Sequence, residues 1–156
     1  MNASTSAIWF IRRARPQDRE PVAQLLARLN RPARSDSVIK EYFVAYSGDQ
    51  IIGCAAVRCR KKIGYLYGLA VEKSWRKRGI GHALTEVRLN RLRTKRSEAA
   101  YVLSMFWNLR FFRKHGFVVT DRRNKGSLEW LHSDFSDAWS KRSALLALVP
   151  LNRLVI

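Results

Sequence analysis

The residues with the clearest potential for chemistry form a short basic turn with two glycines, Trp75 to His82. An apolar run, Tyr65 to Val71, precedes this turn, and apolar residues at helical spacing follow it. Backbone N–H groups at the start of a helix have no acceptor within the helix, and the helix dipole adds positive potential there. Glycine lets the backbone approach a ligand closely, and three basic side chains supply charge. The segment therefore predicts a cradle for a pyrophosphate group.

The chain of 156 residues is strongly basic, with 30 lysines and arginines against 12 acidic residues and a formal charge of +18. A field of this sign attracts polyanions, and nucleic acid, an anionic membrane and phosphorylated small molecules are all compatible with it. The basic residues are spread along the chain and do not gather in one tail. This distribution favours a basic surface that draws in an anionic ligand over dedicated nucleic-acid binding.

The cysteines and histidines indicate neither a disulfide framework nor a metal site. Cys54 and Cys59 are the only cysteines, and the three histidines show no ligand spacing. Residues 1–8 lack the basic start and apolar core of a signal peptide. No apolar run reaches the roughly 20 residues that a membrane-spanning helix needs. We therefore expect a cytoplasmic protein without a structural metal or a membrane span.

Hydrophobic spacing predicts an α+β domain around one central mixed sheet, mostly antiparallel and flanked by helices. The expected strands are 8–13, 42–46, 51–59, 63–71, 99–104 and 117–120, with 128–131 pairing back after a turn at 122–126. The expected helices start near residues 17, 38, 83 and 108. Pro16 suits the first turn of the first helix, and Gly116 suits the position after the last. Three consecutive strands form an antiparallel meander before the glycine turn.

Three further segments leave alternatives open. The helix from Ala83 to about Lys95 has an apolar stripe at Leu84, Val87, Leu89 and Leu92 and a basic face at Arg88, Arg91, Arg93 and Arg96. That basic face is either solvated or in contact with RNA. Residues 30–37 form a loop that either borders a substrate site or only connects two elements. The apolar tail, residues 143–156, packs either on the domain or on the second subunit of a homodimer.

Two motifs carry a resemblance to a known family. Leu69-Ala70-Val71 followed by Trp75-Arg76-Lys77-Arg78-Gly79-Ile80-Gly81 resembles the acetyl-CoA signature of the GNAT N-acetyltransferases, Arg/Gln-x-x-Gly-x-Gly/Ala. Phe111-Phe112-Arg113-Lys114-His115-Gly116-Phe117 is similar to the Phe-Tyr-x-x-x-Gly-Phe of that family. With the order of elements, the resemblance covers residues 8–131. We therefore expect a GNAT-like domain at 8–135 and a C-terminal extension at 136–156.

The resemblance implies a donor site for acetyl-CoA between two splayed strands. The strand ending Leu69-Ala70-Val71 would pair its backbone with the pantetheine arm, and one of its N–H groups would polarise the thioester carbonyl. The far end of the cofactor would lie near Asn108, Phe111 and Phe112. The pyrophosphate would be held at Arg76, Lys77, Arg78, Gly79, Ile80, Gly81 and His82. An amine would attack the thioester directly after losing a proton.

The catalytic acid and base cannot be assigned by the same resemblance. Phe112 occupies the position of the family's frequent tyrosine acid, and it cannot donate a proton. Tyr65 stands where many members carry a glutamate base on the strand. By strand alternation, Tyr65 and Tyr67 share a face with Leu69, so that either hydroxyl could face the acetyl group, or both could simply pack the strand. Ser104, at the end of the next strand, is a weaker candidate, for protonation of the leaving thiolate.

The acceptor is also left open. The Phe-Phe form of the second motif resembles members that act on amino acids or similar small molecules. The high positive charge is similar to that of members that act on aminoacyl-tRNA or on ribosomal proteins. The replacement of the tyrosine by Phe112 is compatible with a different class of protein, a module that binds acetyl-CoA or RNA without catalysis. We expect an N-acetyltransferase acting on a primary amine.

Overall fold

The computed structural model describes residues 7–31, 38–120 and 143–151. Its strands are β1 (Phe10–Arg13), β2 (Tyr42–Ser47), β3 (Gln50–Arg60), β4 (Ile63–Val71), β5 (Ala99–Met105), β6 (Val118–Val119) and β7 (Ser143–Leu148). Its α-helices are α1 (Arg19–Arg28), α2 (Ile80–Thr94) and α3 (Leu109–Arg113). Short 3₁₀ turns are η1 (Pro16–Asp18), η2 (Ile39–Glu41), η3 (Lys73–Trp75) and η4 (Phe106–Asn108). The predicted turn at 122–126 and strand at 128–131 lie outside the described residues.

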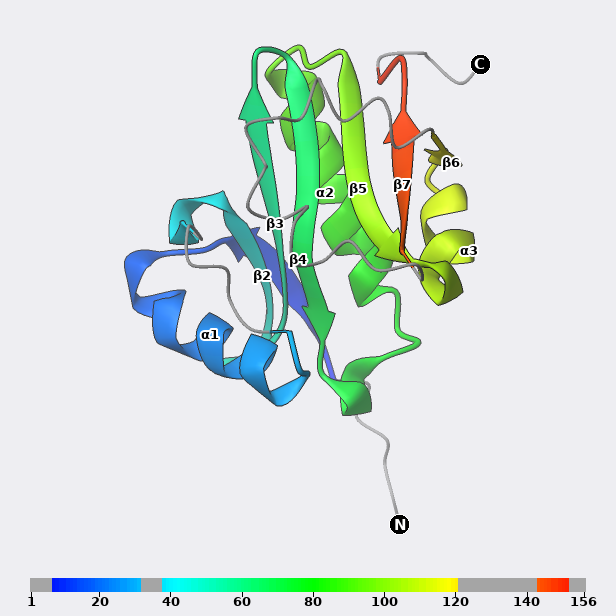
Figure 1. The fold of residues 1–156 in the computed structure, drawn as a ribbon. Helices are drawn as coiled ribbons and strands as arrows, with labels where there is room; N and C mark the ends of the chain where they lie inside the picture. Colours follow the sequence, from blue (N-terminus) through cyan, green and yellow to red (C-terminus); the bar gives the residue numbers. More distant parts are fainter. Residues whose placement is uncertain (1–6, 32–37, 121–142, 152–156) are drawn as a thin grey trace. The chain divides into compact units, whose positions relative to one another are not determined.

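The strands form one sheet in the order β1-β2-β3-β4-β5-β7-β6 (Figure 1). β4 and β5 run parallel, whereas β1–β2, β2–β3, β5–β7 and β6–β7 are antiparallel pairs. This confirms the predicted α+β fold with a mixed, mostly antiparallel sheet. One strand, β7, was not predicted. It comes from the tail and pairs with β5 on one side and β6 on the other.

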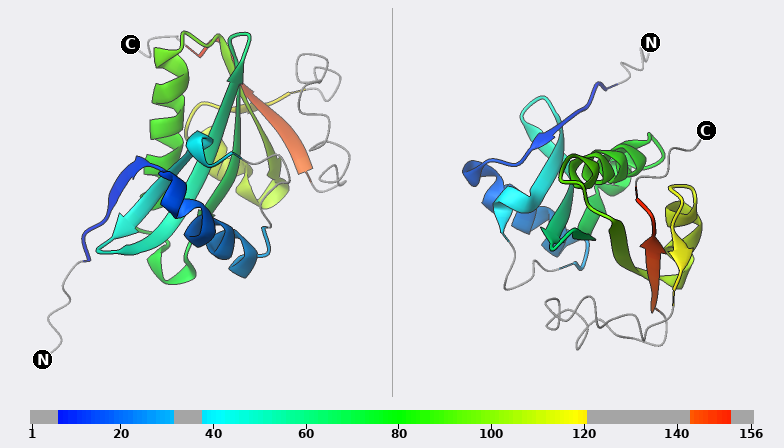
Figure 2. Two further views of the ribbon diagram at one scale, coloured as in Figure 1. Left: turned by 90° about the vertical axis from the view of Figure 1, so that its left-hand side faces the viewer. Right: turned by 90° about the horizontal axis from the view of Figure 1, so that it is seen from above.

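The chain divides into two compact units, and β3, β4 and α2 contribute residues to both. The first unit comprises residues 1–57 and 68–88. In it, α1 and the first half of α2 lie on opposite faces of the strands (Figures 1 and 2). The apolar stripe predicted for α1 is buried at Val22, Leu25 and Leu26. This burial holds α1 against the sheet and fixes the start of the segment that follows it.

The second unit comprises residues 58–67 and 89–156. Its core lies around β5, because Ala99 to Val102 and the β7 residues Leu145 and Leu146 are all buried. α3 adds Phe112, which packs edge-on against Phe117 with ring centroids 5.8 Å apart. The chain leaves α3 through Gly116 at φ +92°, the left-handed conformation expected after a helix end.

One residue of α2 was predicted wrongly. Arg88 was expected on the solvated face, but it is fully buried, with 1% of its surface exposed. The reason is its spacing. Arg88 lies four residues after Leu84 and four before Leu92, and residues four apart share one face of a helix. Both leucines are fully buried, so this stripe of α2 carries the guanidinium into the core.

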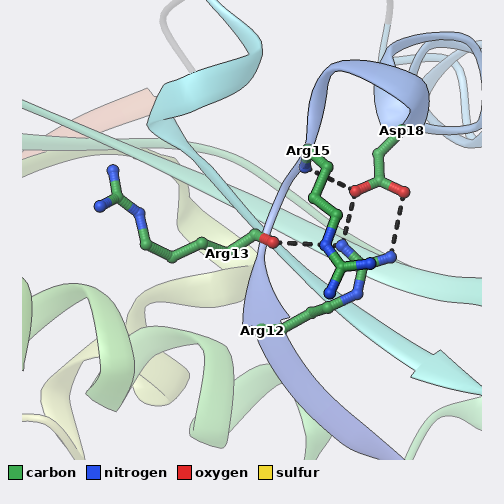
Figure 3. A network of polar contacts seen from close by, with 4 residues as sticks. All are labelled: Arg12, Arg13, Arg15 and Asp18. Carbon is green, nitrogen blue, oxygen red and sulfur yellow. Dashed lines mark hydrogen bonds and ion pairs between the residues drawn. The ribbon is translucent and has the colours of Figure 1, made fainter.

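A cluster of polar contacts joins the end of β1 to the start of α1 (Figure 3). The Asp18 carboxylate accepts hydrogen bonds from Arg12 Nη1 at 2.6 Å and Arg12 Nη2 at 3.1 Å. It also accepts one from the backbone N–H of Arg15 at 2.7 Å. The bond to Arg12 is the main reason that the pKa of Asp18 is lowered, although burial opposes the shift. The buried carboxylate therefore stays ionised and anchors the first helix.

We expect Asp18→Asn to lower the free energy of unfolding by about 1–3 kcal/mol at pH 7, the range for hydrogen bonds to charged groups. A carboxyl group with a lowered folded pKa stabilises above its unfolded pKa of about 3.9 and loses that contribution as the pH falls through the folded value. The difference between wild type and variant should therefore shrink below pH 4. Urea unfolding at pH 7 and pH 3 measures it, with the exposed Asp49→Asn as control. A difference independent of pH would contradict the assignment.

Candidate active site

The C-terminal end of β4 departs from the regular sheet. Ile63 to Leu66 pair with Ala99 to Val102, and the pairing ends there although both strands continue. Gly68 follows with φ +65°, a left-handed conformation that interrupts an extended strand. A side chain at this position would also come within 2.9 Å of the Tyr42 hydroxyl. Residues 69–71 therefore lie outside the ladder with β5, where the sequence predicts that the strands separate.

The backbone of this segment turns one edge toward β3 and leaves the other edge facing away. Glu72 N–H donates to Ile52 O on β3 at 2.8 Å, so the Val71 carbonyl, in the same trans peptide, points away from β3. The Ala70 carbonyl lies on the β3 side, 3.3 Å from where a Cβ on Gly53 would be. The Val71 N–H therefore also points away from β3. This edge offers a donor and an acceptor to an extended ligand.

Two arginines lie along this edge. Arg76 Nε donates to Val71 O at 3.1 Å, and Arg31 Nη1 donates to Leu69 O. Arg31 is exposed, but nearby protein atoms partly desolvate its guanidinium. This desolvation first, and the nearby charge of Arg76 second, lower the pKa of Arg31. Arg76 was predicted as a site residue. Arg31 was not, although it falls in the loop that the sequence placed beside a substrate site as one alternative.

The basic turn leads directly into the N-terminus of α2, which begins at Ile80, slightly earlier than predicted. The first bond of the helix is Ala83 N–H to Gly79 O at 3.0 Å, so the N–H groups of Ile80 and Gly81 have no acceptor within the helix. Gly79 has φ +83°, and among the described residues no atom beyond its chain neighbours lies within 4 Å of where its Cβ would be. Open space beside these donors fits a pyrophosphate group.

The side chains of this turn are basic and exposed: Arg76, Lys77 and Arg78. Arg78 places its guanidinium 4.7 Å from the centre of the Trp75 ring, which orients it by a cation–π contact. Lys77 has φ +63°, so the turn is held in a conformation that few side chains adopt. Positive charge is therefore concentrated next to the helix N-terminus, where the basic side chains and the helix dipole both attract an anion.

A buried chain of hydrogen bonds braces the first turn of α2. Thr85 Oγ1 donates to Gly81 O at 2.9 Å, and Arg88 Nη2 donates to Thr85 Oγ1 at 3.2 Å. Arg88 Nη1 also donates to Ala56 O on β3 at 3.2 Å. Burial lowers the pKa of Arg88 to about 9, which is still above neutrality, so the guanidinium remains charged. The sequence analysis did not predict this brace. The spacing of Arg88, four residues from both Leu84 and Leu92, could have indicated that it lies on the buried face of α2.

The tyrosines proposed as catalytic candidates are buried in the second unit. Tyr65 and Tyr67 are 4% and 8% exposed, and their rings stack at 6.0 Å with 14° between the planes. The Arg58 guanidinium lies 5.5 Å from the Tyr67 ring. The two rings share a face, as alternation predicts, but Gly68 interrupts the alternation before Leu69. A catalytic role for either hydroxyl remains a prediction.

If the Tyr65 hydroxyl takes part in proton transfer, Tyr65→Phe should lower kcat by about 100-fold or more, the usual contribution of acid–base catalysis. The KM for acetyl-CoA should not change, because only the reacting end of the site is altered. Steady-state kinetics from pH 6 to pH 10 measure both constants, with Tyr67→Phe as the matched variant. An unaltered kcat across this range would remove Tyr65 from the candidates.

The other predicted site residues of the second unit lie on β5, η4 and α3. Ser104 is buried and its hydroxyl donates to Met105 O at 3.2 Å. Asn108 is half-buried at the end of η4. Phe112 is buried, with its ring edge-on to Phe111 at 5.0 Å. These contacts describe how Ser104 and Phe112 pack within the second unit. A role for any of the three residues toward a cofactor stays a prediction.

The arrangement of metal-binding side chains and the state of Cys54 bear on metal and cysteine chemistry among the described residues. In residues 7–31, 38–120 and 143–151, no group of three or more His, Cys, Asp or Glu side chains is placed to hold a metal ion. Burial raises the pKa of the Cys54 thiol to about 12, so it is not a thiolate at neutral pH. Within the same part of the chain, no helix is both long and apolar enough to cross a membrane.

A strand edge beside a phosphate cradle is the kind of site that binds a nucleotide with an extended arm, and comparison with known proteins identifies the class. Residues 39–119 match the family model of the acetyltransferase (GNAT) domain. The chain belongs to the GNAT acetyltransferase family. By family it is therefore an N-acetyltransferase, as the sequence predicts. The search of curated proteins gives no match.

Solved structures share the fold at low sequence identity. A Mycobacterium tuberculosis protein in complex with CoA and NLQ is 22% identical, with a TM-score of 0.72 over 90% of this chain and 98% of that one. N-acetylglutamate synthase from Neisseria gonorrhoeae, complexed with CoA and N-acetyl-glutamate, is 21% identical, with a TM-score of 0.76 over 92% of this chain but 35% of that one. An Arabidopsis thaliana protein with the bisubstrate analogue CoA-Ac-MVNAL is 19% identical, with a TM-score of 0.70 over 90% and 97%.

Proposed function

We propose that this chain transfers the acetyl group of acetyl-CoA to a primary amine by direct attack on the thioester. The observation that carries the proposal is the continuity of the two binding features. The edge of β4 at Leu69 to Val71 turns the Val71 N–H and carbonyl away from β3, and the cradle from Arg76 to Gly81 follows within the same unit. An extended thioester arm would pair with the former and its pyrophosphate with the latter.

The chemistry requires little from the protein beyond positioning and proton removal. The ammonium group of the acceptor loses a proton, and its nitrogen then bonds to the carbonyl carbon. The carbon–sulfur bond breaks, and the sulfur leaves as a thiolate that takes up a proton. A backbone N–H on the β4 edge, such as that of Val71, would stabilise the negative charge that develops on the carbonyl oxygen. The amine proton is accepted by Tyr65, Tyr67 or water, and Ser104 is the weaker candidate for protonating the leaving thiolate.

The acceptor falls within small molecules, amino acids and protein amines. Two solved relatives of the fold span this range, since one contains N-acetyl-glutamate and another a peptide-bearing bisubstrate analogue. The formal charge of +18 supports an anionic or RNA-linked acceptor such as aminoacyl-tRNA as a further class. A cytoplasmic location and a homodimer also remain predictions from the sequence.

Release of CoA thiol, detected with DTNB, tests the proposal. The full-length protein and acetyl-CoA would be incubated with amino acids, polyamines, peptides and aminoacyl-tRNA, each with a no-enzyme control. We expect saturable CoA release with at least one amine, and an acetylated product of matching mass. Acetyl-CoA hydrolysis without any acetylated amine would contradict the proposal.

Phe112 motivates a second candidate, a module that binds acetyl-CoA without catalysis. Its ring is buried against Phe111 and Phe117, and it has no proton to donate. Saturable acetyl-CoA binding by calorimetry, together with no turnover on any acceptor in the panel, would favour this module over the enzyme.

A further inference from the structure

Arg31 lies on the same strand edge as the donor site but is separate from the phosphate cradle. Its guanidinium donates to Leu69 O, whereas Arg76 of the cradle donates to Val71 O. Two residues of extended strand span about 7 Å, so the carbonyls that accept from Arg31 and Arg76 lie about that far apart along β4. The cradle marks the pyrophosphate end of the site. Arg31 therefore lies toward the opposite end, where the thioester and the acceptor are expected to meet.

The charge on Arg31 is poorly compensated. A carbonyl oxygen carries only a partial charge, and among the residues that the structure describes, no carboxylate forms an ion pair with Arg31. Partial desolvation lowers the pKa of Arg31 most, and the nearby like charge of Arg76 lowers it further. Arg28, three residues earlier, differs in this respect, because its Nη2 pairs with the Glu72 carboxylate. An anion beside Arg31 would relieve the repulsion and complete the hydrogen bonds of its guanidinium.

We propose that Arg31 binds the carboxylate of the acetyl acceptor, and that the substrate class is therefore the free amino acid. The inference rests on the proposed function. In an α-amino acid the amine and the carboxylate are bonded to the same carbon, so a carboxylate held by Arg31 brings the amine next to Leu69. In a peptide N-terminus or an aminoacyl-tRNA, the α-carboxyl group is tied up in an amide or an ester. Neither can form this ion pair.

The test compares each free L-amino acid with its α-carboxamide in the CoA-release assay. The two compounds share the amine and the side chain and differ only in the negative charge. For the wild-type protein we expect kcat/KM to be roughly 10–100-fold higher for the free acid, the range set by one hydrogen bond between charged groups. Arg31→Gln should remove this preference by raising the KM for the acid, and Arg31→Lys should restore part of it.

A matched control removes a positive charge from the same end of α1. Arg28→Gln should keep the preference for the free acid, because that guanidinium is already paired with Glu72. Calorimetry with acetyl-CoA verifies that each variant is folded and binds the donor, and Arg31→Gln should bind it as wild type does. A rise in the KM for acetyl-CoA instead of the acceptor would overturn the inference, because Arg31 would then serve a phosphate of the donor.

The remaining outcomes separate the inference from the function on which it rests. Equal turnover of acids and carboxamides, or turnover of peptides and aminoacyl-tRNA alone, would overturn the inference and leave the acetyltransferase proposal intact. Binding of acetyl-CoA without turnover of any amine would overturn the proposed function and the inference with it.

Discussion

Replacement of Gly79 by valine should raise the Kd for acetyl-CoA by roughly 100-fold or more. The reason is steric and electrostatic together. In the part of the chain that the structure describes, no atom beyond the chain neighbours of Gly79 lies within 4 Å of its Cβ position, so a valine side chain would fill the volume proposed for the ligand. Loss of one or two hydrogen bonds from backbone N–H groups to a charged phosphate accounts for a change of this size. Isothermal titration with acetyl-CoA measures the Kd directly.

The Gly79→Val variant should remain folded, because no described residue other than the chain neighbours lies within 4 Å of the new Cβ. The left-handed φ of +83° costs roughly 1–2 kcal/mol for a residue with a Cβ. Gly48→Val is the matched control. Gly48 also has a left-handed φ, of +56°, and open space at its Cβ, but it lies in the turn between β2 and β3. An unchanged Kd in Gly79→Val, or an equal loss in Gly48→Val, would contradict the cradle.

Truncation of the buried arginine should have the largest effect on stability. Arg88→Ala removes a fully buried side chain, leaves a cavity, and takes a donor from the Ala56 carbonyl. We expect the free energy of unfolding to fall by about 3–5 kcal/mol, the range for large truncations in a core. Acetyl-CoA affinity should fall as well, because the brace through Thr85 to the first turn of α2 is lost.

The apolar variant Arg88→Met should be less damaging than Arg88→Ala. Methionine fills much of the same volume, and it removes a buried charge whose unfavourable solvation lowers the pKa of Arg88 to about 9. The pKa lies well above neutrality, so the difference between wild type and Arg88→Met should stay constant from pH 5 to pH 8. Guanidinium-chloride unfolding measures both variants, with the exposed Arg93→Ala as control. A loss in Arg88→Ala no larger than in this control would show that the brace does not stabilise the fold.

Local patterns were sufficient for most elements of this chain. β4 coincides with its predicted range, and α2 begins and ends within a few residues of the prediction. These segments have clear hydrophobic periodicity and are bounded by glycine or basic turns, so sequence-local information determines them. The family followed from two short motifs in the expected order, and the match over residues 39–119 confirms it.

The features that the sequence did not predict have a common cause, because each depends on residues that are far away in the sequence. β7 becomes a strand because β5 and β6 supply its hydrogen bonds, and its apolar tail sequence alone fits several kinds of packing. Arg88 is buried because its guanidinium donates hydrogen bonds to carbonyls on β3 and α2. Its charge by itself predicts a solvent-exposed side chain. Composition and spacing describe one segment at a time, and a polar group is buried only where another segment satisfies it.

By itself, the sequence of Trp75 to His82 predicted a pyrophosphate cradle, because two glycines, three basic residues and a helix start lie within one short segment. Only the tertiary structure decided what surrounds that cradle. It brings Arg31 from the end of α1 to the Leu69 carbonyl, and it turns the Val71 N–H and carbonyl away from β3. The physical reason is that a strand edge acquires a direction only when its neighbour has paired with the other side. The residues expected to bind the donor therefore lie in one short segment, whereas recognition of the acceptor depends on residues that folding brings together.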